Sequence, residues 1–152
     1  MSMISQQDIG LLSTNALVHV ATIGTQGEPQ SSPVWFDWDG EFIKISLTKN
    51  RQKYRNLQRE QRVALSIVDP QNPYHYLEIR GTVARIDENP QTAFPFIDAL
   101  AKKYLNMDKY PNTQPGDERV IVYIKPKHTT HQIYASQGAI KRNTRKMSMR
   151  SG

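Results

Sequence analysis

The chain has 152 residues, with 20 Lys plus Arg against 14 Asp plus Glu, a formal charge of +6 and no cysteine. This length suits one domain with a buried core, and the lack of cysteine excludes disulfide scaffolds, thiolate catalysis and Cys-ligated zinc or iron–sulfur sites. No window reaches the roughly 18 apolar residues that span a bilayer, and no signal-peptide pattern opens the chain. We therefore expect a cytoplasmic protein with no membrane partner.

Most of the positive charge lies in two clusters. Residues 141–152 hold five basic side chains and no acid, so the remaining 15 basic residues face 14 acidic ones in residues 1–140. Residues 49–62 hold six basic side chains and one acid. We expect residues 1–135 to form the domain and residues 136–152 a basic, disordered tail. Weak, salt-dependent binding of polyanions is an alternative role for this tail, and no specific nucleic-acid partner is expected.

The first half of the chain is typical of strands with one short helix. Alternating apolar residues predict a three-stranded meander over residues 16–48, with glycine-containing turns between the strands. Its strands are expected at 17–23, 33–38 and 43–48. Asn50 is then expected to cap a helix over residues 51–60, with Tyr54 and Leu57 on its inner face.

The second half repeats the strand pattern around one longer helix. Strands are predicted at 63–68, 74–86 and 120–124, with an extension at 129–134. A phase shift in the apolar pattern predicts a bulge near Gly81, and Asn89 followed by proline opens a helix that ends near Leu105. About six strands with peripheral helices favour a mainly β fold, a small barrel whose closure removes exposed edges.

Basic residues gather at the start of the predicted helix over residues 51–60. Lys49, Arg51 and Lys53 lie where unpaired backbone N–H groups and the helix dipole favour an anion. A solvated cationic helix face is the alternative. Basic residues normally gather in the last turn of a helix, so their position favours an anion or phosphate site.

Aromatic residues mark two further candidate sites. Phe36 and Trp38 are expected in the core, whereas Trp35 lies on the opposite face and is the candidate for a ligand or subunit contact. Tyr74 and Tyr76 open the strand at 74–86, where they either line a cavity mouth or plug a barrel end. The sequence favours neither of these two readings.

Metal and hydrolase sites have little support in the sequence. His128 and His131 are three residues apart in an extended segment, so their side chains point to opposite faces and cannot clasp one ion. No nucleophile-elbow, Walker or Gly-x-Gly-x-x-Gly pattern is present. We expect no metal site and assign no catalytic acid, base or nucleophile.

Four segments occur together in an order and spacing that resemble a known superfamily. They are residues 32–40, 51–57, 62–70 and 76–81, and the chain is similar to the pyridoxamine 5'-phosphate oxidase-like split-barrel flavoproteins over about residues 8–126. More narrowly, it resembles the branch of oxidoreductases that depend on the deazaflavin coenzyme F-420. The resemblance implies a homodimer of six-stranded antiparallel split β-barrels of the FMN-binding type, with two flavin or deazaflavin sites at the dimer interface.

The resemblance also implies a set of cofactor-binding residues. Arg51 and Lys53 match the basic pair on the cofactor phosphate, with Thr48 and Lys49 beside them. Tyr74 and Tyr76 would approach from the partner subunit's side. The strand that runs along the cofactor ring matches Gln30, Ser31, Ser32, Pro33 and Val34.

The implied activity is an oxidoreductase that transfers a hydride between bound coenzyme F-420 or FMN and an unidentified small organic substrate. The alternative is an FMN- or haem-binding split-barrel protein without efficient turnover. The superfamily's true pyridoxamine phosphate oxidases carry a C-terminal Trp and an Arg-x-His element, and residues 131–152 have neither. Pyridoxine phosphate is therefore not the expected substrate.

Overall fold

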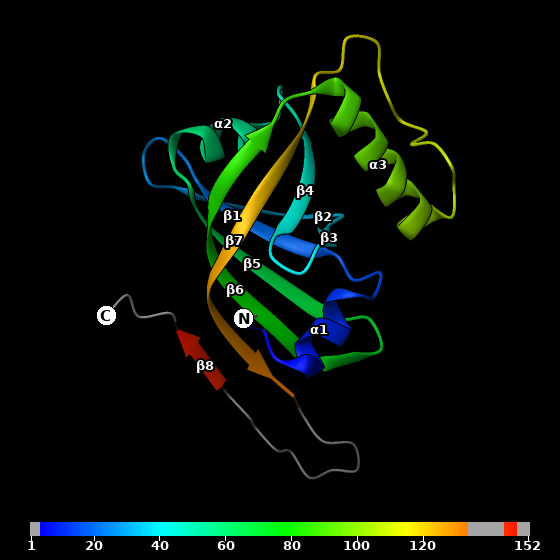
Figure 1. Cartoon of the computed structure of the whole chain (residues 1–152). Helices are drawn as coiled ribbons and strands as arrows, with labels where there is room; N and C mark the ends of the chain where they lie inside the picture. The colour runs from blue at the N-terminus through cyan, green and yellow to red at the C-terminus, as the bar shows by residue number, and fades with distance from the viewer. Residues whose placement is uncertain (1–3, 134–144, 149–152) are drawn as a thin grey trace.

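The computed structural model describes residues 4–133 and 145–148 (Figure 1). Within these residues the strands greatly outnumber the helices, which confirms the mainly β fold class. The helices are α1 (Gln6–Leu12), α2 (Gln52–Arg59) and α3 (Pro90–Leu105). The strands are β1 (Val18–Ile23), β2 (Pro29–Val34), β3 (Asp37–Trp38), β4 (Ile43–Thr48), β5 (Arg62–Asp69), β6 (Asn72–Asp87), β7 (Arg119–Gln132) and β8 (Arg145–Ser148). In this part of the chain, no helix has both the length and the apolar character needed to cross a bilayer.

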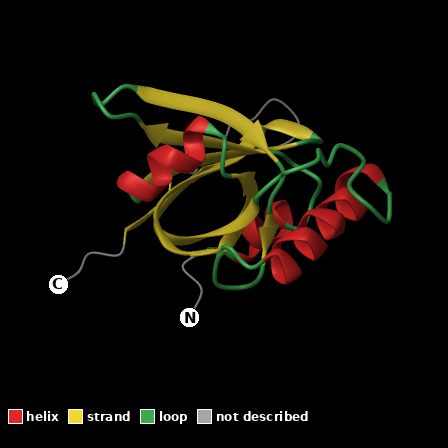
Figure 2. Cartoon of the chain, turned by 90° about the horizontal axis from the view of Figure 1, so that it is seen from above, coloured by secondary structure: helices red, strands yellow, loops and turns green. Residues whose placement is uncertain are grey.

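The strands form one antiparallel sheet that curls on itself. Its order is β2-β1-β5-β6-β7-β4-β3, and β8 pairs with β7. Strands β2 and β3 stand at opposite ends of this order, yet only two residues separate Val34 from Asp37. Three Cα steps span no more than about 11 Å, so the two ends of the sheet must lie close together. Figure 2 shows the strands curving round into an incomplete ring. The result is a barrel with a seam between β2 and β4.

The strand predicted over 33–38 is divided in the structure. The chain pairs with β1 over Pro29–Val34, leaves the sheet at Trp35 and Phe36, and pairs with β4 over Asp37–Trp38. Two side chains of α3 hydrogen-bond to the backbone of Phe36 and hold it out of the sheet. The Tyr104 hydroxyl accepts a hydrogen bond from the Phe36 N–H at 3.3 Å, and the Lys103 ammonium donates to the Phe36 carbonyl at 2.9 Å. Together with β8, this division corrects the prediction of six strands to eight among the described residues.

One apolar core fills the barrel. Inward-facing residues alternate along the strands, as in β4, where Ile43, Ile45 and Leu47 are buried and the residues between them are half-buried. Leu12 of α1 and Leu57 of α2 join the same core, and the two helices lie at opposite ends of the barrel (Figure 1). Helices α1 and α2 therefore close the ends that the strands leave open.

A second, smaller cluster lies under α3. Ala93 of α3 packs with Ile121 and Tyr123 of β7, and Phe42 and Phe96 lie against them. Because α3 covers its outer face, β7 is buried on both sides over its first six residues. This explains why residues 120–124 are continuously apolar instead of alternating.

The helix boundaries agree with the predictions except for one cap. Asn89 caps α3 by accepting from the Gln91 N–H at 3.0 Å, and the residue after the helix, Asn106, is its C-cap with a φ of 57°. For α2, however, the N-cap is Arg51, and no side chain caps the helix. The Asn50 side chain instead accepts a hydrogen bond from the Thr48 hydroxyl at 2.6 Å. The predicted Asn50 cap is therefore wrong.

Helix α1 was not predicted, and a buried polar cluster holds it in place. The Asp8 carboxylate, 1% exposed, lies 2.6 Å from His131 Nδ1 and 3.3 Å from His75 Nε2. The other His75 nitrogen lies 3.1 Å from the Asp69 carboxylate. These partners come from β5, β6 and β7, so the cluster ties α1 to three strands of the barrel.

The predicted bulge near Gly81 is confirmed. The register between β6 and β7 shifts between Arg80 and Gly81, and again between Val83 and Arg85. A Cβ atom at Gly81 would lie 2.5 Å from the carbonyl oxygen of Lys125, so glycine permits the close approach of the two strands.

Part of the predicted tail can be described. Residues 145–148 form β8 against β7, from His128 to His131, whereas we expected no secondary structure in residues 136–152. The other residues of the predicted tail lie outside the described ones.

Candidate functional site

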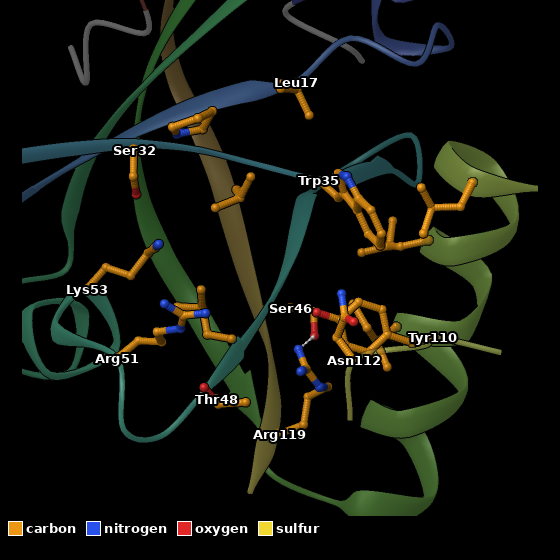
Figure 3. A pocket seen from close by; sticks show the side chains of 16 residues that line it. Leu17, Ser32, Trp35, Ser46, Thr48, Arg51, Lys53, Tyr110, Asn112 and Arg119 are labelled. Atoms are coloured by element: carbon orange, nitrogen blue, oxygen red, sulfur yellow. Dashed lines mark hydrogen bonds between the residues drawn. The ribbon is translucent and has the colours of Figure 1, made fainter. Parts of the chain in front are cut away.

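A cavity of about 580 Å³ lies at the seam between β2 and β4 (Figure 3). Helices α2 and α3, the loop after α3 and the first residue of β7 complete its wall. Its lining residues are Leu17, Ser32, Pro33, Val34, Trp35, Ser46, Leu47, Thr48, Arg51, Lys53, Ile97, Leu100, Leu105, Tyr110, Asn112 and Arg119. The cavity exists because the curled sheet brings its two edges together.

The cavity wall carries positive charge that no lining acid balances. Arg51, Lys53 and Arg119 are cations, and none of the described residues that line the cavity is Asp or Glu. The remaining polar groups are neutral, among them the hydroxyls of Ser46 and Thr48. Such a wall favours a ligand with at least one anionic group.

Local structure at the end of β4 places the first two cations. The Lys49 N–H donates to the Glu118 carbonyl at 2.9 Å, and the Arg51 N–H donates to the Thr48 carbonyl at 3.1 Å, which turns the chain into α2. Because no side chain caps α2, the first N–H groups of the helix are available to an anion. The anion site expected from the sequence lies at this helix start and stays a prediction.

Burial and repulsion both act on Lys53. Desolvation lowers the pKa of the Lys53 ammonium, and the nearby Arg51 guanidinium lowers it further. Both effects destabilise the charged form. An anion bound between these two side chains would oppose both effects.

Arg119 is the most buried of the three cations. It is 8% exposed, and its Nη1 donates to the Ser46 hydroxyl at 3.0 Å. Its guanidinium lies 5.1 Å from the centre of the Tyr110 ring. Desolvation is the largest cause that lowers the pKa of Arg119, and Arg51 adds to it, while Tyr110 and Asp117 act in the opposite direction.

Aromatic rings form the wall nearest α3. Trp35 stacks on Tyr104 with ring centres 5.2 Å apart and an angle of 4° between the planes. Tyr110 meets Trp35 edge-on at 5.8 Å. The chain leaves the sheet at Trp35, so this ring lines the cavity, whereas Phe36 is fully buried in the core as predicted.

Six of the eleven predicted site residues line the cavity. They are Ser32, Pro33, Val34, Thr48, Arg51 and Lys53. Residues predicted from charge and helix position therefore line the same cavity as residues predicted from the resemblance. Pro33, which has no N–H to donate, fits here because β2 is an edge strand that pairs only with β1.

Three other predicted residues lie near the cavity but do not line it. The Gln30 side chain accepts a hydrogen bond from the Asn56 amide at 3.4 Å, and Ser31 lies between Gln30 and Ser32 on exposed edge strand β2. The Lys49 ammonium lies 2.8 Å from Glu88 and 3.6 Å from Glu118, and its bond to Glu88 raises the pKa of Lys49. Lys49 thus has acidic partners within its own chain.

Tyr74 and Tyr76 lie on β6, away from the cavity lining of their own chain. Tyr74 is 62% exposed, and the Tyr76 hydroxyl donates to the Gln132 side chain at 2.9 Å. Neither side chain belongs to the core cluster inside the barrel.

Sequence reasoning missed four polar residues of the cavity: Ser46, Tyr110, Asn112 and Arg119. Tyr110 and Asn112 belong to the loop over 107–117, to which we assigned no function. Arg119 pairs with Thr48 in the register of β4 with β7. The only local signal for Arg119 is a basic residue directly before an apolar run, and this signal does not reveal which strand lies beside it.

The cavity can bind and orient a ligand, but it holds no recognisable set of reacting side chains. No group of three or more His, Cys, Asp or Glu residues suited to a metal ion occurs in the described part of the chain. His131 points to Asp8, and His128 lies 3.4 Å from the Thr130 hydroxyl. The two histidines therefore have separate partners.

Comparisons with known proteins give one family match and several similar structures. The family model for pyridoxamine 5'-phosphate oxidase matches residues 8–132. A solved structure described as an F420 reductase is 37% identical with a TM-score of 0.73, and the match covers 83% of this chain and 98% of that one. A conserved hypothetical protein from Mycobacterium tuberculosis is 23% identical with a TM-score of 0.68, covering 84% of each chain. General stress protein 26 from Bacillus anthracis is 14% identical with a TM-score of 0.62, covering 91% of this chain and 94% of that one. The last two show similarity of fold alone.

Proposed function

This chain belongs to the pyridoxamine 5'-phosphate oxidase family, and we propose from this that it is an oxidoreductase that uses a flavin or deazaflavin. The cofactor is coenzyme F-420 or FMN, and the second reactant is a small organic molecule. When bound, the cofactor supplies the hydride chemistry, and the protein supplies binding, orientation and exclusion of water.

The observation that carries this proposal is the acid-free cationic cavity at the seam of the barrel. Both cofactors carry a phosphate group, and Arg51, Lys53 and the uncapped start of α2 offer charge-assisted hydrogen bonds to it. Desolvation and then repulsion by Arg51 lower the pKa of Lys53, so the charged form of Lys53 gains from an arriving anion. The donor set therefore fits a phosphorylated cofactor.

The remaining lining residues fit a flat ring. Ser32, Pro33 and Val34 belong to the open edge of β2, which can face a ring without losing sheet hydrogen bonds. Trp35 adds an aromatic wall, and Leu17 adds apolar surface. These residues would hold the ring and keep water from it.

Haem fits the same cavity less well. Haem iron is normally held by His, Cys, Met or Tyr. Of these four residue types, only Tyr110 occurs among the described lining residues. This favours a flavin or deazaflavin over haem.

We also propose that the protein is a homodimer in which Tyr74 and Tyr76 belong to the partner subunit's site. Large apolar side chains are exposed on the surface, among them Leu17 at the cavity and Val68 and Tyr74 beside the β5–β6 turn. A partner subunit that packs on the β5–β6 turn would cover Val68 and Tyr74 together.

An absorption spectrum of the purified protein and parallel titrations with FMN and coenzyme F-420 test the proposed function. Arg51→Ala and Lys53→Ala should each weaken binding about tenfold to a hundredfold, because each removes a charge-assisted hydrogen bond. Arg55→Ala is the matched control. Arg55 belongs to the same helix, but its guanidinium donates to the Asn50 carbonyl and the Gln52 side chain and does not line the cavity.

Three outcomes would contradict the proposal in different ways. If neither cofactor binds, the protein is not a flavin or deazaflavin enzyme. Unchanged affinity in both Arg51→Ala and Lys53→Ala would place the phosphate elsewhere. Tight binding without reduction or oxidation of the cofactor by any tested substrate would favour the role without turnover.

A further inference from the structure

Arg119 has no assigned role, although its surroundings are those of a binding residue. The side chain is 8% exposed, and its Nε is buried without a hydrogen-bond partner. Its Nη1 donates to the Ser46 hydroxyl and the Tyr110 side chain lies beside the guanidinium, but no ion pair joins Arg119 to a carboxylate of the described residues. A charged group is therefore buried at the cavity with its donors only partly used.

Burying a guanidinium in this way is unfavourable unless an acceptor compensates it. Desolvation lowers the pKa of Arg119 overall, although Tyr110 and then Asp117 act to raise it. The Asp117 carboxylate itself accepts from the Gln114 N–H at 2.9 Å. Arg51 adds repulsion. The compensating acceptor is thus expected from a ligand and not from the described protein groups.

Arg119 faces a different part of the cavity from Arg51 and Lys53. The latter two extend from the start of α2, whereas Arg119 lies at the start of β7, with Tyr110 and Asn112 on its other side (Figure 3). The wall beyond it consists of apolar residues of α3 and the aromatic rings of Trp35 and Tyr110. This part of the cavity combines one cation, one amide and a largely apolar wall.

We propose that Arg119 binds the carboxylate of an organic substrate whose apolar body lies against α3 and Trp35. The planar guanidinium presents a fork of N–H donors that matches a carboxylate, and the single bond from Nη1 to Ser46 leaves terminal N–H groups for such a ligand. Asn112 can donate to a second oxygen of the same molecule. The inference rests on the proposed function, since it treats Arg51 and Lys53 as the phosphate contacts.

Two small anions, with one neutral control, distinguish the two parts of the cavity. Benzoate is a planar carboxylate with an apolar body, and benzamide is its neutral counterpart. Inorganic phosphate probes Arg51 and Lys53. Each probe is titrated into the full chain, without cofactor and with FMN, by calorimetry and by intrinsic tryptophan fluorescence.

We expect each variant to weaken the binding of one anion and not of the other. Arg119→Gln should weaken benzoate at least about tenfold, because it removes a charge-assisted hydrogen bond, and should leave phosphate unchanged. Lys53→Ala should do the reverse. Benzamide should bind wild type and Arg119→Gln equally weakly. Arg80→Gln, which removes an exposed arginine outside this cavity, should change neither probe.

Retained phosphate binding shows that Arg119→Gln is folded. If this variant does not fold, Arg119→Lys gives the same test, with benzoate weakened about fivefold because an ammonium lacks the planar fork of donors. Equal benzoate affinity in wild type and the Arg119 variant would overturn the proposal. So would a loss of phosphate or FMN binding without a loss of benzoate binding. If no cofactor binds but benzoate still depends on Arg119, the proposed function fails and the carboxylate site stands.

Discussion

At the scale of single residues, Tyr104 links α3 to two separate parts of the chain. Its hydroxyl donates to the Ala16 carbonyl at 2.6 Å and accepts from the Phe36 N–H at 3.3 Å. The ring stacks on Trp35 at the cavity wall. A single phenol therefore fixes both the break between β2 and β3 and the orientation of an aromatic cavity residue.

The Tyr104 hydroxyl gives a prediction for alkaline pH. Burial raises the pKa of Tyr104 to about 12, whereas an unfolded tyrosine ionises near about 10. Between these values the folded protein keeps a proton that the unfolded chain has lost, so stability falls as pH rises. The contribution is complete below about pH 10 and lost toward about pH 12.

Tyr104→Phe should therefore differ from wild type in a pH-dependent way. At neutral pH we expect it to be less stable by about 1 kcal/mol, because the Ala16 carbonyl loses its donor. The difference should shrink above about pH 10, since only the wild type carries the ionisable group. Urea unfolding across this pH range measures the difference in the free energy of unfolding. If the difference between the two proteins does not change with pH, the raised pKa of Tyr104 is contradicted.

The site residues that could be predicted from the sequence are those with a local signal. Arg51 and Lys53 are basic residues at the start of a helix. Their charge and the helix start can both be recognised from a few neighbouring residues. Arg119 lines the same cavity because β4 and β7 pair in one register, which places it beside Thr48. No spacing rule connects residues 71 positions apart, so its place required the structure.

At the scale of elements, β6 shows how one glycine shapes the barrel. The strand runs for 16 residues and pairs with both β5 and β7. Its register with β7 shifts at Gly81, where the Lys125 carbonyl approaches too closely for a side chain. Such bulges bend a strand. A strand of this length must bend to follow the curvature of a closed sheet.

Gly81→Ala should therefore destabilise the fold. The added Cβ would lie 2.5 Å from the backbone oxygen of Lys125, which cannot move aside like a flexible side chain. We expect a loss of about 1–3 kcal/mol in the free energy of unfolding. Gly10→Ala is the control, because nothing lies within 4 Å of a Cβ there and alanine favours a helix over glycine by about 1 kcal/mol. Equal effects of the two substitutions in urea unfolding would show that the close approach is unimportant.

Elements with their own start and stop signals were predicted well. Helix α3 begins after Asn89 and ends before Asn106, and both residues make the caps that their types favour. The break in the predicted strand over 33–38 depends instead on Tyr104, and α1 depends on Asp8 meeting His75 and His131. These partners are distant in sequence, which is why local patterns did not reveal either feature.

At the scale of the whole molecule, closure of the sheet makes the site. The count of strands predicted a barrel, but not the order β2-β1-β5-β6-β7-β4-β3, which puts β2 at one end of the sheet and the β3–β4 pair at the other. The cavity lies at this seam and gathers residues from Leu17 to Arg119. A chain with the same strands in another order would scatter these residues over separate surfaces.

The proposed homodimer can be tested by mixing two defective variants. Lys53→Ala removes a phosphate contact from a subunit's own cavity, and Tyr74→Ala removes a side chain that we assign to the partner's site. In a two-fold dimer each subunit gives its cavity to one site and its Tyr74 to the other. A mixed dimer therefore contains one site with both residues intact and one site with neither.

Each variant alone should bind FMN weakly, and an equal mixture refolded together should regain tight binding at about a quarter of its sites, since half of the dimers are mixed. Sedimentation gives the oligomeric state, and a titration that follows the flavin spectrum counts the tight sites. Mixing without refolding is the control and should restore nothing while the dimers stay associated. A monomer, or a refolded mixture with no tight sites, would show that Tyr74 does not act across a subunit boundary.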